Sequence, residues 1–351
     1  MNTYHINNII ESGATVKEAL EKLNGLPTRD SLTLFVVDKD KKLAGALTDG
    51  DIRRGLLQGK TIGDKVESIM NKQFKYLQRN NFEIDYIDEL KAKEIDLIPF
   101  LNGEFEIEKI IDLTKVRSIL PLDAVIMAGG EGLRLRPLTT NTPKPLLLVG
   151  DTPILERNID RLVLYGVDNF HLSLNYLGEK IKDHFGNGKS RSVTISYTEE
   201  KEACGTIGAV SLIDEFLHDE VLIMNSDLLT NIDFEDFYRS FKRSGADMSV
   251  ATIPYQISLP YGVIESEENR VISIKEKPTY TYYSNAGIYI VKKELLSVIP
   301  KHKVYNATDL LQHCLDTKHP VYNYPILGYW LDIGKHEDFL KAQEDIKHLK
   351  F

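Results

Sequence analysis

The feature that most constrains the fold is an apolar run that breaks into a glycine-rich, cationic loop. Residues 124–127 (Ala-Val-Ile-Met) are typical of a buried parallel strand. Three glycines follow at once: Gly129, Gly130 and Gly132. Three cations come next: Arg134, Arg136 and Lys144. Because glycines let the backbone approach an oxyanion and point N–H groups at it, the pattern predicts a phosphate-binding loop.

Length and composition restrict the class of protein. A chain of 351 residues is long enough for two domains, and 42% hydrophobic with 27% charged residues is ordinary globular composition. The net charge of −9 argues against a general nucleic-acid binder, so the loop's ligand should be small and anionic. No apolar run reaches 18 residues and the N-terminus lacks a signal-peptide pattern, so we expect a cytoplasmic protein without a membrane partner. Cys204 and Cys314, far apart and without a CxxC, predict neither a disulfide nor a thiolate metal site.

The first third of the chain contains a repeated pattern. Its first copy predicts a helix at 15–23, with Thr15 as N-cap and Glu18 completing a capping box, and then strands at 32–37 and 43–47. A weaker second copy extends from about residue 64 to 118. Residues 119–122 are a short linker, so we expect one domain at 1–120 and another at 121–351.

The first copy ends in Gly45-x-x-Thr48-x-x-Asp51, which resembles the nucleotide-contacting motif of cystathionine-β-synthase-type (CBS) modules. The resemblance implies an α+β CBS pair. It also implies a regulatory nucleotide at Thr48 and Asp51, where the hydroxyl faces a phosphate and the carboxylate accepts from ribose. Two alternatives stay open: a capping turn at the start of the next helix, or a packing module without a ligand. The second copy lacks this motif.

The remainder of the chain alternates strands and helices, which predicts an α/β, doubly wound Rossmann-like sheet. Thr152-Pro153 is expected to open an amphipathic helix with Ile154, Leu155, Ile159, Leu162 and Val163 on its inner side, and Gly166 should lie just beyond its end. An antiparallel insertion is expected around 255–290. The strands are expected at 170–175, 193–197, 221–224, 248–253, 263–265, 271–274 and 286–291.

Two carboxylates follow apolar or aromatic residues at predicted strand ends. Asp227 ends the run Val-Leu-Ile-Met-Asn-Ser-Asp, and Asp332 follows Tyr-Trp-Leu. Ligands of open α/β sheets lie at the carboxyl ends of the strands, and Mg²⁺ beside phosphates takes one or two protein carboxylates. The sequence therefore predicts a magnesium site at Asp227 and Asp332. The alternatives are a helix N-cap for Asp227 and a turn residue for Asp332.

The loop, written Gly129-Gly130-x-Gly132-x-Arg134-Leu-x-Pro137-Leu-Thr139 and followed by Pro143-Lys144-Pro145, resembles the signature of sugar-1-phosphate nucleotidyltransferases. The resemblance implies catalytic roles for Arg134, Lys144, Asp227, Lys277 and Asp332. It implies that nucleotide binding involves Ala128, Gly129, Gly130, Glu131, Gly132, Glu200, Gly205, Thr206 and Ser226. It implies that the sugar phosphate is held by Gly262, Glu276, Lys277, Asn285 and Gly287.

Glu200 bears on the choice of base. In pyrimidine-using members of that family, the residue five positions before the glycine of the Gly205 turn is typically a glutamine. A carboxylate only accepts, so it would repel the carbonyl oxygens of uracil but take two bonds from guanine N1–H and N2–H. The alternative is a solvated charge within the acidic run 199–202.

The resemblance implies an enzyme that condenses a nucleoside triphosphate, GTP by this argument, with a sugar-1-phosphate. A CBS pair ahead of such a domain resembles the glucosamine-1-phosphate guanylyltransferases of legionaminic acid synthesis, which favours that sugar. The alternatives are mannose-1-phosphate as substrate, or UTP, CTP or dTTP as donor. A non-catalytic nucleotide sensor is the alternative of another class. We also expect a homo-oligomer.

Overall fold

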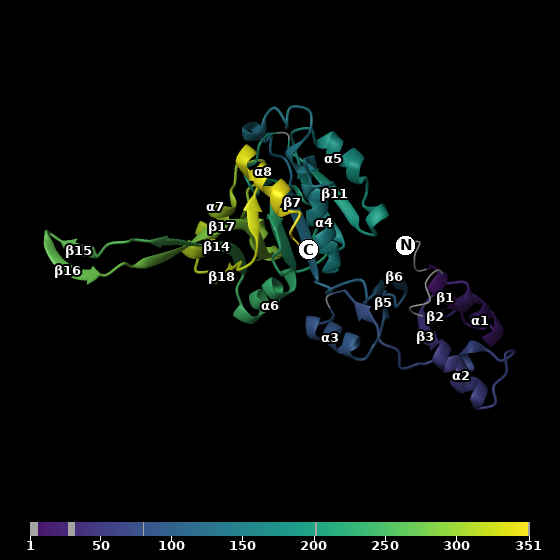
Figure 1. Ribbon diagram of the computed structural model, residues 1–351. Helices are drawn as coiled ribbons and strands as arrows, with labels where there is room; N and C mark the ends of the chain where they lie inside the picture. Colours follow the sequence, from purple (N-terminus) through teal and green to yellow (C-terminus); the bar gives the residue numbers. More distant parts are fainter. Residues whose placement is uncertain (1–5, 27–31, 80, 201, 350–351) are drawn as a thin grey trace. The chain divides into compact units, whose positions relative to one another are not determined.

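A computed structural model describes residues 6–26, 32–79, 81–200 and 202–349 (Figure 1). The chain divides into two compact units. The N-terminal unit comprises residues 1–121, 164–166 and 189–192, and the C-terminal unit comprises 122–163, 167–188 and 193–351. In the described ranges no helix is both long and apolar enough to cross a bilayer. Cys204 and Cys314 are free thiols and both are buried.

The N-terminal unit contains the predicted repeat. Each copy has a three-stranded sheet in which the first pair of strands is parallel and the second antiparallel. The first copy consists of β1 (Ile9–Glu11), α1 (Val16–Asn24), β2 (Thr33–Val37), β3 (Leu43–Thr48) and α2 (Asp49–Leu57). The second consists of β4 (Leu77–Gln78), α3 (Ile84–Ala92), β5 (Leu97–Leu101) and β6 (Ile107–Asp112). Phe35 and Leu43 of the first copy share a buried cluster with Leu101 and Ile110 of the second, so the copies fold as one body.

Local sequence explains where these helices begin. The predicted capping box at α1 is present: Glu18 N–H donates to Thr15 Oγ1 at 3.2 Å, and Thr15 N–H donates to Glu18 Oε2 at 2.6 Å. The buried face of α1 consists of Val16, Ala19 and Leu23, at helical spacing. The helix therefore begins where its first free N–H groups find a side-chain acceptor.

The C-terminal unit is built on a sheet that, over the described residues, has the order β11-β10-β7-β12-β17-β14-β18. Four neighbouring strands are parallel: β7 (Leu122–Met127), β10 (Asn169–Leu174), β11 (Thr194–Glu199) and β12 (Glu220–Asn225). The rest of the sheet is β14 (Met248–Ser258), β17 (Thr279–Lys292) and β18 (Val321–Pro325). Short strand pairs outside it are β8 (Leu148–Val149) with β9 (Thr152–Pro153), β13 (Leu228–Thr230) with β19 (Trp330–Asp332), and β15 (Val263–Glu267) with β16 (Arg270–Lys275).

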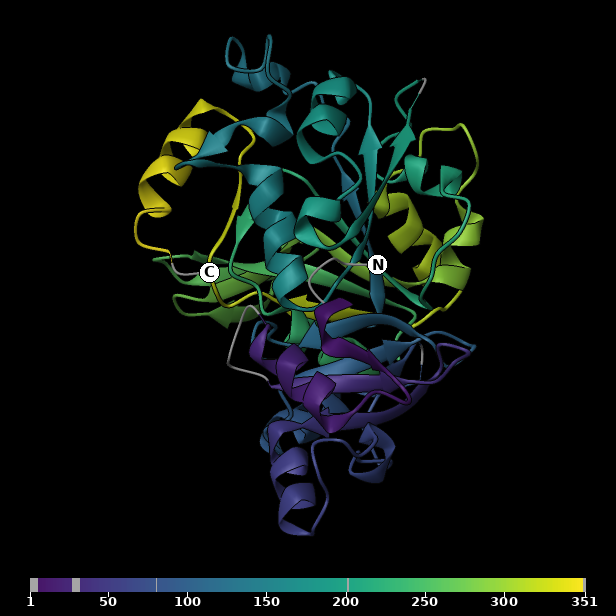
Figure 2. The same ribbon diagram turned by 90° about the vertical axis from the view of Figure 1, so that its right-hand side faces the viewer.

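Helices cover this sheet, and α4 and α5 lie along its parallel strands in Figures 1 and 2. The helices are α4 (Ile154–Leu164), α5 (Gly178–Phe185), α6 (Phe234–Ser244), α7 (Ala307–Asp316) and α8 (His336–Asp345). Helix α7 packs Leu310 and Cys314 against Val125 and Ile223. The α/β architecture predicted from strand–helix alternation is confirmed, and Gly166 follows α4 with φ of 75°. The predicted opening of this helix at Thr152-Pro153 is wrong, because these two residues pair with Leu148–Val149 as β9 and the helix begins at Ile154.

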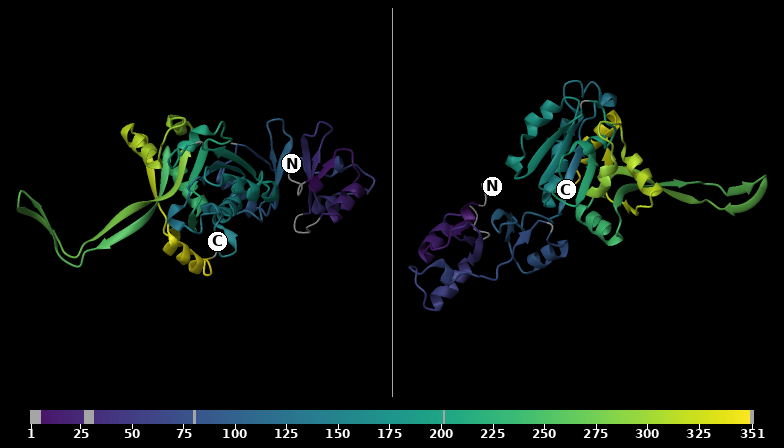
Figure 3. Two further views of the ribbon diagram at one scale, coloured as in Figure 1. Left: turned by 90° about the horizontal axis from the view of Figure 1, so that it is seen from above. Right: turned by 180° about the vertical axis from the view of Figure 1, so that it is seen from behind.

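Beyond the sheet, β14 and β17 continue into an antiparallel arm, residues 253–284, which carries β15 and β16 at its end (Figures 1 and 3). The sequence predicted an antiparallel insertion here. It ended the first flanking strand at residue 253 and began the second at residue 286. The observed strands are longer because the alternation of Tyr, Gln, Ser and Thr continues the ladder out of the core.

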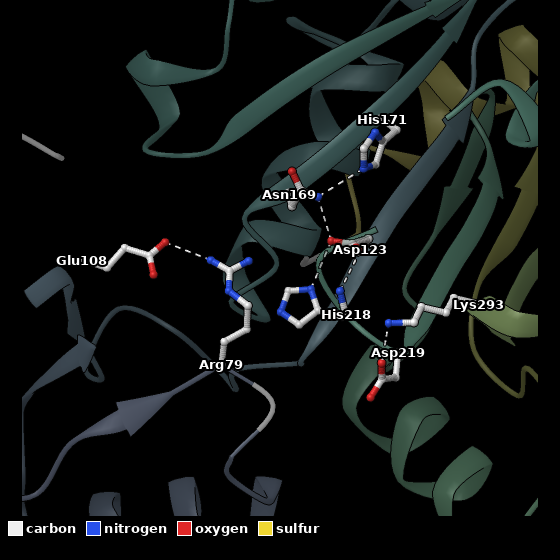
Figure 4. A network of polar contacts seen from close by, with 8 residues as sticks. All are labelled: Arg79, Glu108, Asp123, Asn169, His171, His218, Asp219 and Lys293. Atoms are coloured by element: carbon white, nitrogen blue, oxygen red, sulfur yellow. Dashed lines mark hydrogen bonds and ion pairs between the residues drawn. The ribbon is translucent and has the colours of Figure 1, made fainter. Parts of the chain in front are cut away.

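A buried polar network lies at the start of β7 (Figure 4). Asp123 accepts from Asn169 Nδ2 at 2.7 Å and from the His218 backbone N–H at 3.0 Å, and His218 Nδ1 lies 3.1 Å away. Burial raises the pKa of Asp123, but the hydrogen bonds from His218 and Asn169 outweigh it and hold that pKa below the ordinary carboxyl range. The network is structural, since the ligands of such sheets lie at the opposite ends of the strands.

We expect Asp123→Asn to lower the free energy of unfolding by about 1–3 kcal/mol at neutral pH, because a buried hydrogen-bonded carboxylate is lost. A lowered folded pKa stabilises the protein above the carboxyl's ordinary pKa, and this contribution is lost as pH falls through the folded pKa. The difference between the variant and the wild type should therefore shrink below about pH 4. Urea unfolding at neutral and acid pH measures both effects. The control is Asp219→Asn, which removes a surface pair with Lys293 and should cost at most about 1 kcal/mol.

Candidate active site

A cleft of about 600 Å³ opens at the carboxyl ends of β7 and β12. Its wall includes most of the residues that the sequence singled out for nucleotide binding or for catalysis. Those on the wall are Gly129, Gly130, Glu131, Gly132, Arg134, Lys144, Glu200, Gly205, Thr206, Ser226 and Asp227. Ala128 is fully buried at the end of β7, where its N–H donates to Ser173 O at 2.9 Å. The structure thus brings together segments far apart in the sequence.

Two glycines of the loop are required by close packing. Gly132 has φ of 63°, and a Cβ there would come within 2.9 Å of Thr139 Cγ2 and 3.1 Å of Lys144 Cβ. At Gly129, a Cβ would approach Asn175 and Glu200 at 3.1–3.3 Å. A side chain at either position would displace the loop, so the glycines keep the backbone N–H groups at the cleft wall.

Lys144 and Asp227 form an ion pair at the floor of the cleft, and both side chains are largely buried. Asp332 lies beside them because β13, which begins just after Asp227, pairs with β19 in the register Leu228↔Asp332. The backbone N–H of Ile333 donates to Asp227 O at 3.1 Å, which fixes the two segments together. Neither aspartate caps a helix: Asp233 caps α6 by accepting from the N–H groups of residues 235 and 236. The N-cap alternative for Asp227 is therefore wrong.

The two aspartates fit a divalent cation. Asp227 Oδ1 and Asp332 Oδ1 are buried and accept no hydrogen bond from the described residues. Burial raises the pKa of Asp332 and the Asp227 carboxylate raises it further, while Lys144 and Arg134 partly offset these effects. Two buried carboxylate oxygens without donors, repelling each other, are suited to Mg²⁺, which takes one or two carboxylates and fills its shell with phosphate and water. Within the described ranges no group of three or more His, Cys, Asp or Glu forms a metal site.

Glu200 lies on the cleft wall and is not a freely solvated charge. Ser173 Oγ donates to Glu200 Oε1, and the Cys204 backbone N–H donates to Oε2 at 2.9 Å. The Glu200 N–H donates to Leu174 O at 2.9 Å, which extends the β10–β11 pairing by one residue. The side chain is thus held in a fixed orientation. Each oxygen still has a lone pair for a donor in the cleft.

The turn at Gly205 and Thr206 packs against the N-terminal end of α7. Gly205 has φ of 79°, and a Cβ there would meet Tyr305 O at 2.8 Å. Thr206 N–H donates to Asn306 Oδ1 at 3.2 Å, and Thr206 Oγ1 accepts from the first N–H of α7, at Ala307, at 2.8 Å. Ser226 is buried, and its backbone N–H donates to Met127 O at 3.2 Å. These contacts tie both segments to the ends of β7 and α7.

The residues expected to hold the sugar phosphate are divided between two places. Asn285 and Gly287 line a second hollow of about 390 Å³, together with Trp330 and Asp332. Gly287 has φ of 72°, and a Cβ there would meet Asn225 Nδ2 at 2.6 Å. Among the described residues that line this hollow none is a lysine or an arginine.

Gly262, Glu276 and Lys277 lie on the arm instead. All three are exposed, and a Cβ at Gly262 would come within 3.0 Å of Glu276 Oε2. Lys277 N–H donates to Tyr261 O at 3.2 Å, as part of the arm's ladder. The structure therefore does not bring these three to either hollow of their own chain, and their sugar-phosphate role stays a prediction.

Sequence reasoning missed three supporting residues: Ser173, Asn225 and Asn306. Asn225 lines both hollows, and its position at the end of a buried strand was the available signal. Asn306 begins a capping-box pattern, Asn-Ala-Thr-Asp, that was readable at α7. Ser173 had no sequence signal, because its contact with Glu200 depends on the register Leu174↔Glu199 of β10 and β11.

In the N-terminal unit, Thr48 and Asp51 form the capping box of α2, the alternative left open by the sequence. Thr48 N–H and Oγ1–H donate to Asp51 Oδ2 at 2.8 and 2.6 Å, and Arg54 donates to Asp51 Oδ1 at 2.6 Å. Both side chains thus have partners within their own helix. A role for them in binding a regulatory nucleotide stays a prediction.

Comparison with known proteins agrees with this geometry. A sequence model of the Nucleotidyl transferase family matches residues 123–348, and one of the CBS domain matches residues 8–58, the first copy of the repeat. The chain is 34% identical over 230 residues to bifunctional protein GlmU of Methanocaldococcus jannaschii, covering 64% of this chain and 54% of that protein. It is 29% identical over 234 residues to mannose-1-phosphate guanylyltransferase of Mycobacterium tuberculosis, covering 64% of each.

The match thus spans less than two thirds of either relative's length. The crystal structure of HddC from Yersinia pseudotuberculosis superimposes with a TM-score of 0.50 at 27% identity, covering 64% of this chain and 99% of that one. Because the family match covers well over half of the chain, and includes the glycine loop, Lys144 and both aspartates, this protein belongs to the nucleotidyl transferase family and carries a CBS domain at its N-terminal side.

Proposed function

We propose that the C-terminal unit transfers a nucleotidyl group from GTP to a sugar-1-phosphate, forming a GDP-sugar and pyrophosphate. The observation that supports this most is the group formed by Lys144, Asp227 and Asp332 at the floor of a glycine-lined cleft. A cation and two largely buried carboxylates beside the glycines of the loop suit a reaction in which phosphate charge must be positioned and stabilised.

In the proposed reaction, an oxygen of the sugar-1-phosphate attacks the α-phosphorus of GTP and the bond to the β-phosphate's bridging oxygen breaks. The attacking phosphate is already an anion, so no general base is required. Arg134 holds the departing β- and γ-phosphates, and Lys144 stabilises the charge that develops on the α-phosphate. The ammonium of Lys144 has three donors, so it can keep Asp227 while it binds phosphate. Mg²⁺, held by Asp227 and Asp332, would supply further charge neutralisation at the reacting phosphates.

The proposed sugar is glucosamine-1-phosphate, supported by the order of the two units, with mannose-1-phosphate as the alternative. The hollow at Asn285 and Gly287 is where the sugar would lie, next to Asp332. Turnover of GTP with each of the two sugar phosphates decides between them. Equal kcat/KM for both would contradict the choice of glucosamine-1-phosphate.

The proposed base is guanine, read by the remaining lone pairs of Glu200. We expect Glu200→Gln to reduce kcat/KM for GTP by a factor equivalent to about 1–3 kcal/mol. The ratio of kcat/KM for GTP to kcat/KM for UTP should fall as well. The matched control is Glu202→Gln, an exposed residue of the same acidic run, which should change neither value. A Glu200→Gln enzyme with unchanged preference for GTP would contradict this role.

A further inference from the structure

The phosphate loop, residues 129–141, is held internally by local turns. It contains one turn of 3-10 helix at Leu133–Leu135, and its backbone bonds join residues three apart, as from Thr140 N–H to Pro137 O at 3.1 Å. Bonds of this kind fix the shape of each turn and do not tie the loop to the sheet. The position of the loop's N–H groups therefore depends on contacts with the rest of the unit.

Tyr176 bonds the phosphate loop at both ends. Its backbone N–H donates to Gly129 O at 3.4 Å, and its hydroxyl donates to Thr140 O at 2.9 Å, with Thr139 O at 3.3 Å. Inside the loop, Thr139 Oγ1 donates to Gly132 O at 2.9 Å. The end that Tyr176 holds is thus bonded in turn to the last glycine. One residue connects the first glycine of the loop with its far end.

In the part of the chain that the structure describes, two other side chains reach the loop's backbone from outside. Lys180 Nζ donates to Asn141 O at 2.5 Å, and His336 Nε2 lies 2.9 Å from Arg136 O. Both side chains are exposed and each reaches a single point, whereas Tyr176 is half-buried. A hydrogen bond that is shielded from water is stronger than an exposed one. We therefore take Tyr176 as the main connection.

The topology of the sheet explains why Tyr176 lies there. It follows β10, which pairs with β7 in the parallel register Ser173↔Met127, so the residues just past the two strand ends are neighbours. The chain then turns through Leu177, whose φ of 51° is a left-handed conformation that leucine rarely adopts, before α5 begins. A strained residue persists where the surrounding contacts fix it, and such residues gather at functional sites.

We propose that Tyr176 is a positioning residue for nucleotide binding, which clamps the phosphate loop so that its glycines and Arg134 stay where the β- and γ-phosphates bind. The identity of the ligand rests on the proposed function, and the clamp rests on the contacts of Tyr176. Tyr176 is not part of the cleft wall, so it acts through the loop. Holding a loop in its binding conformation reduces the ordering cost of binding, which raises the affinity for the phosphates.

The clamp is tested first by binding. Tyr176→Phe removes the hydroxyl and keeps the ring. In isothermal titration calorimetry it should weaken the binding of inorganic pyrophosphate and of GTP about 2–10-fold each, the range expected for one hydrogen bond. The affinity for guanosine, which has no phosphate, should not change. The matched control is Tyr197→Phe, which should change none of the three affinities, because the Tyr197 hydroxyl donates to Gly186 O at 2.5 Å, outside the loop.

Trypsin reports on the opening of the loop. Within residues 129–145 the only bond open to trypsin is Arg134–Leu135, because Arg136 and Lys144 are each followed by proline. Leu135 is fully buried, so this cut requires the loop to open, and its rate follows the open population. Tyr176→Phe should raise the rate of the cut about 2–10-fold, and pyrophosphate should slow it in the wild type.

Steady-state kinetics separate a clamp on the phosphates from a general loosening of the fold. In Tyr176→Phe the KM for GTP should rise by the factor seen in binding, since the loop contacts the phosphates throughout the reaction. The kcat and the KM for the sugar-1-phosphate should stay within about twofold of wild type.

Thr139→Val breaks the same clamp from the loop's side, because it loses the bond to Gly132 O and keeps the shape of the side chain. It should match Tyr176→Phe in every readout, and it replaces that variant if circular dichroism shows Tyr176→Phe to be unfolded. Unchanged cleavage and unchanged pyrophosphate affinity, or an equal weakening of guanosine binding, would overturn the clamp. A wild type that binds pyrophosphate and shows the Tyr176 effect but makes no nucleotide-sugar would contradict the proposed function and leave the clamp standing.

Discussion

Asp227→Asn is expected to lower kcat by about 10²-fold or more without unfolding the protein, because several kcal/mol of charge stabilisation at the reacting phosphates are lost. Asparagine has nearly the same shape and still offers an acceptor to Lys144, so the floor of the cleft should keep its geometry. The readout is steady-state pyrophosphate release at saturating Mg²⁺, with circular dichroism to confirm the fold.

The matched control is Asp214→Asn, an exposed aspartate outside the cleft, which should retain wild-type turnover. Near-normal turnover of Asp227→Asn in Mg²⁺ would show that Asp227 does not hold the metal. It would leave Asp332 as the carboxylate to examine.

Lys144→Gln is expected to cost about 10²–10³-fold in kcat, the usual effect of removing one preorganised donor from developing charge. The variant also removes the buried ammonium that pairs with Asp227 and offsets the repulsion between Asp227 and Asp332. Added Mg²⁺ should not restore the rate, because the metal and the ammonium stabilise different oxygens. The control is Lys341→Gln on α8, an exposed lysine, with no expected change. A Lys144→Gln enzyme within a few-fold of wild type would contradict the role of this cation.

Much of the C-terminal unit was predictable because its sequence signals are local. The run 124–127 and its glycines identify β7 and the loop, since only a buried strand and a close-packed turn need those residues. Asp227 was singled out because it comes just after the buried strand β12, at the carboxyl edge of the sheet. Asp332 lies beside it through the separate antiparallel pair of β13 with β19. Capping residues such as Thr15 were found because they act on the next three residues of the same segment.

The remainder depends on contacts that no local pattern encodes. A solvated surface charge stayed open as the alternative for Glu200, and only the pairing of β10 with β11 places Ser173 against it. The strands around Glu276 and Lys277 were recognised, but the direction taken by a hairpin is a tertiary property. The hairpin's alternation of apolar and polar residues predicts that one of its faces is buried. The same pattern arises whether the residues packed against that face belong to this chain or to another molecule.

The most direct test of the account is pyrophosphate release measured for a panel of nucleoside triphosphates crossed with sugar-1-phosphates in Mg²⁺, with Asp227→Asn as the blank. We predict release well above the blank, with GTP giving the highest kcat/KM and glucosamine-1-phosphate the preferred acceptor. Release that is fastest with UTP or CTP would contradict the guanylyl assignment. Binding of nucleotides without release above the blank for any pair would contradict the enzyme itself and favour a nucleotide sensor.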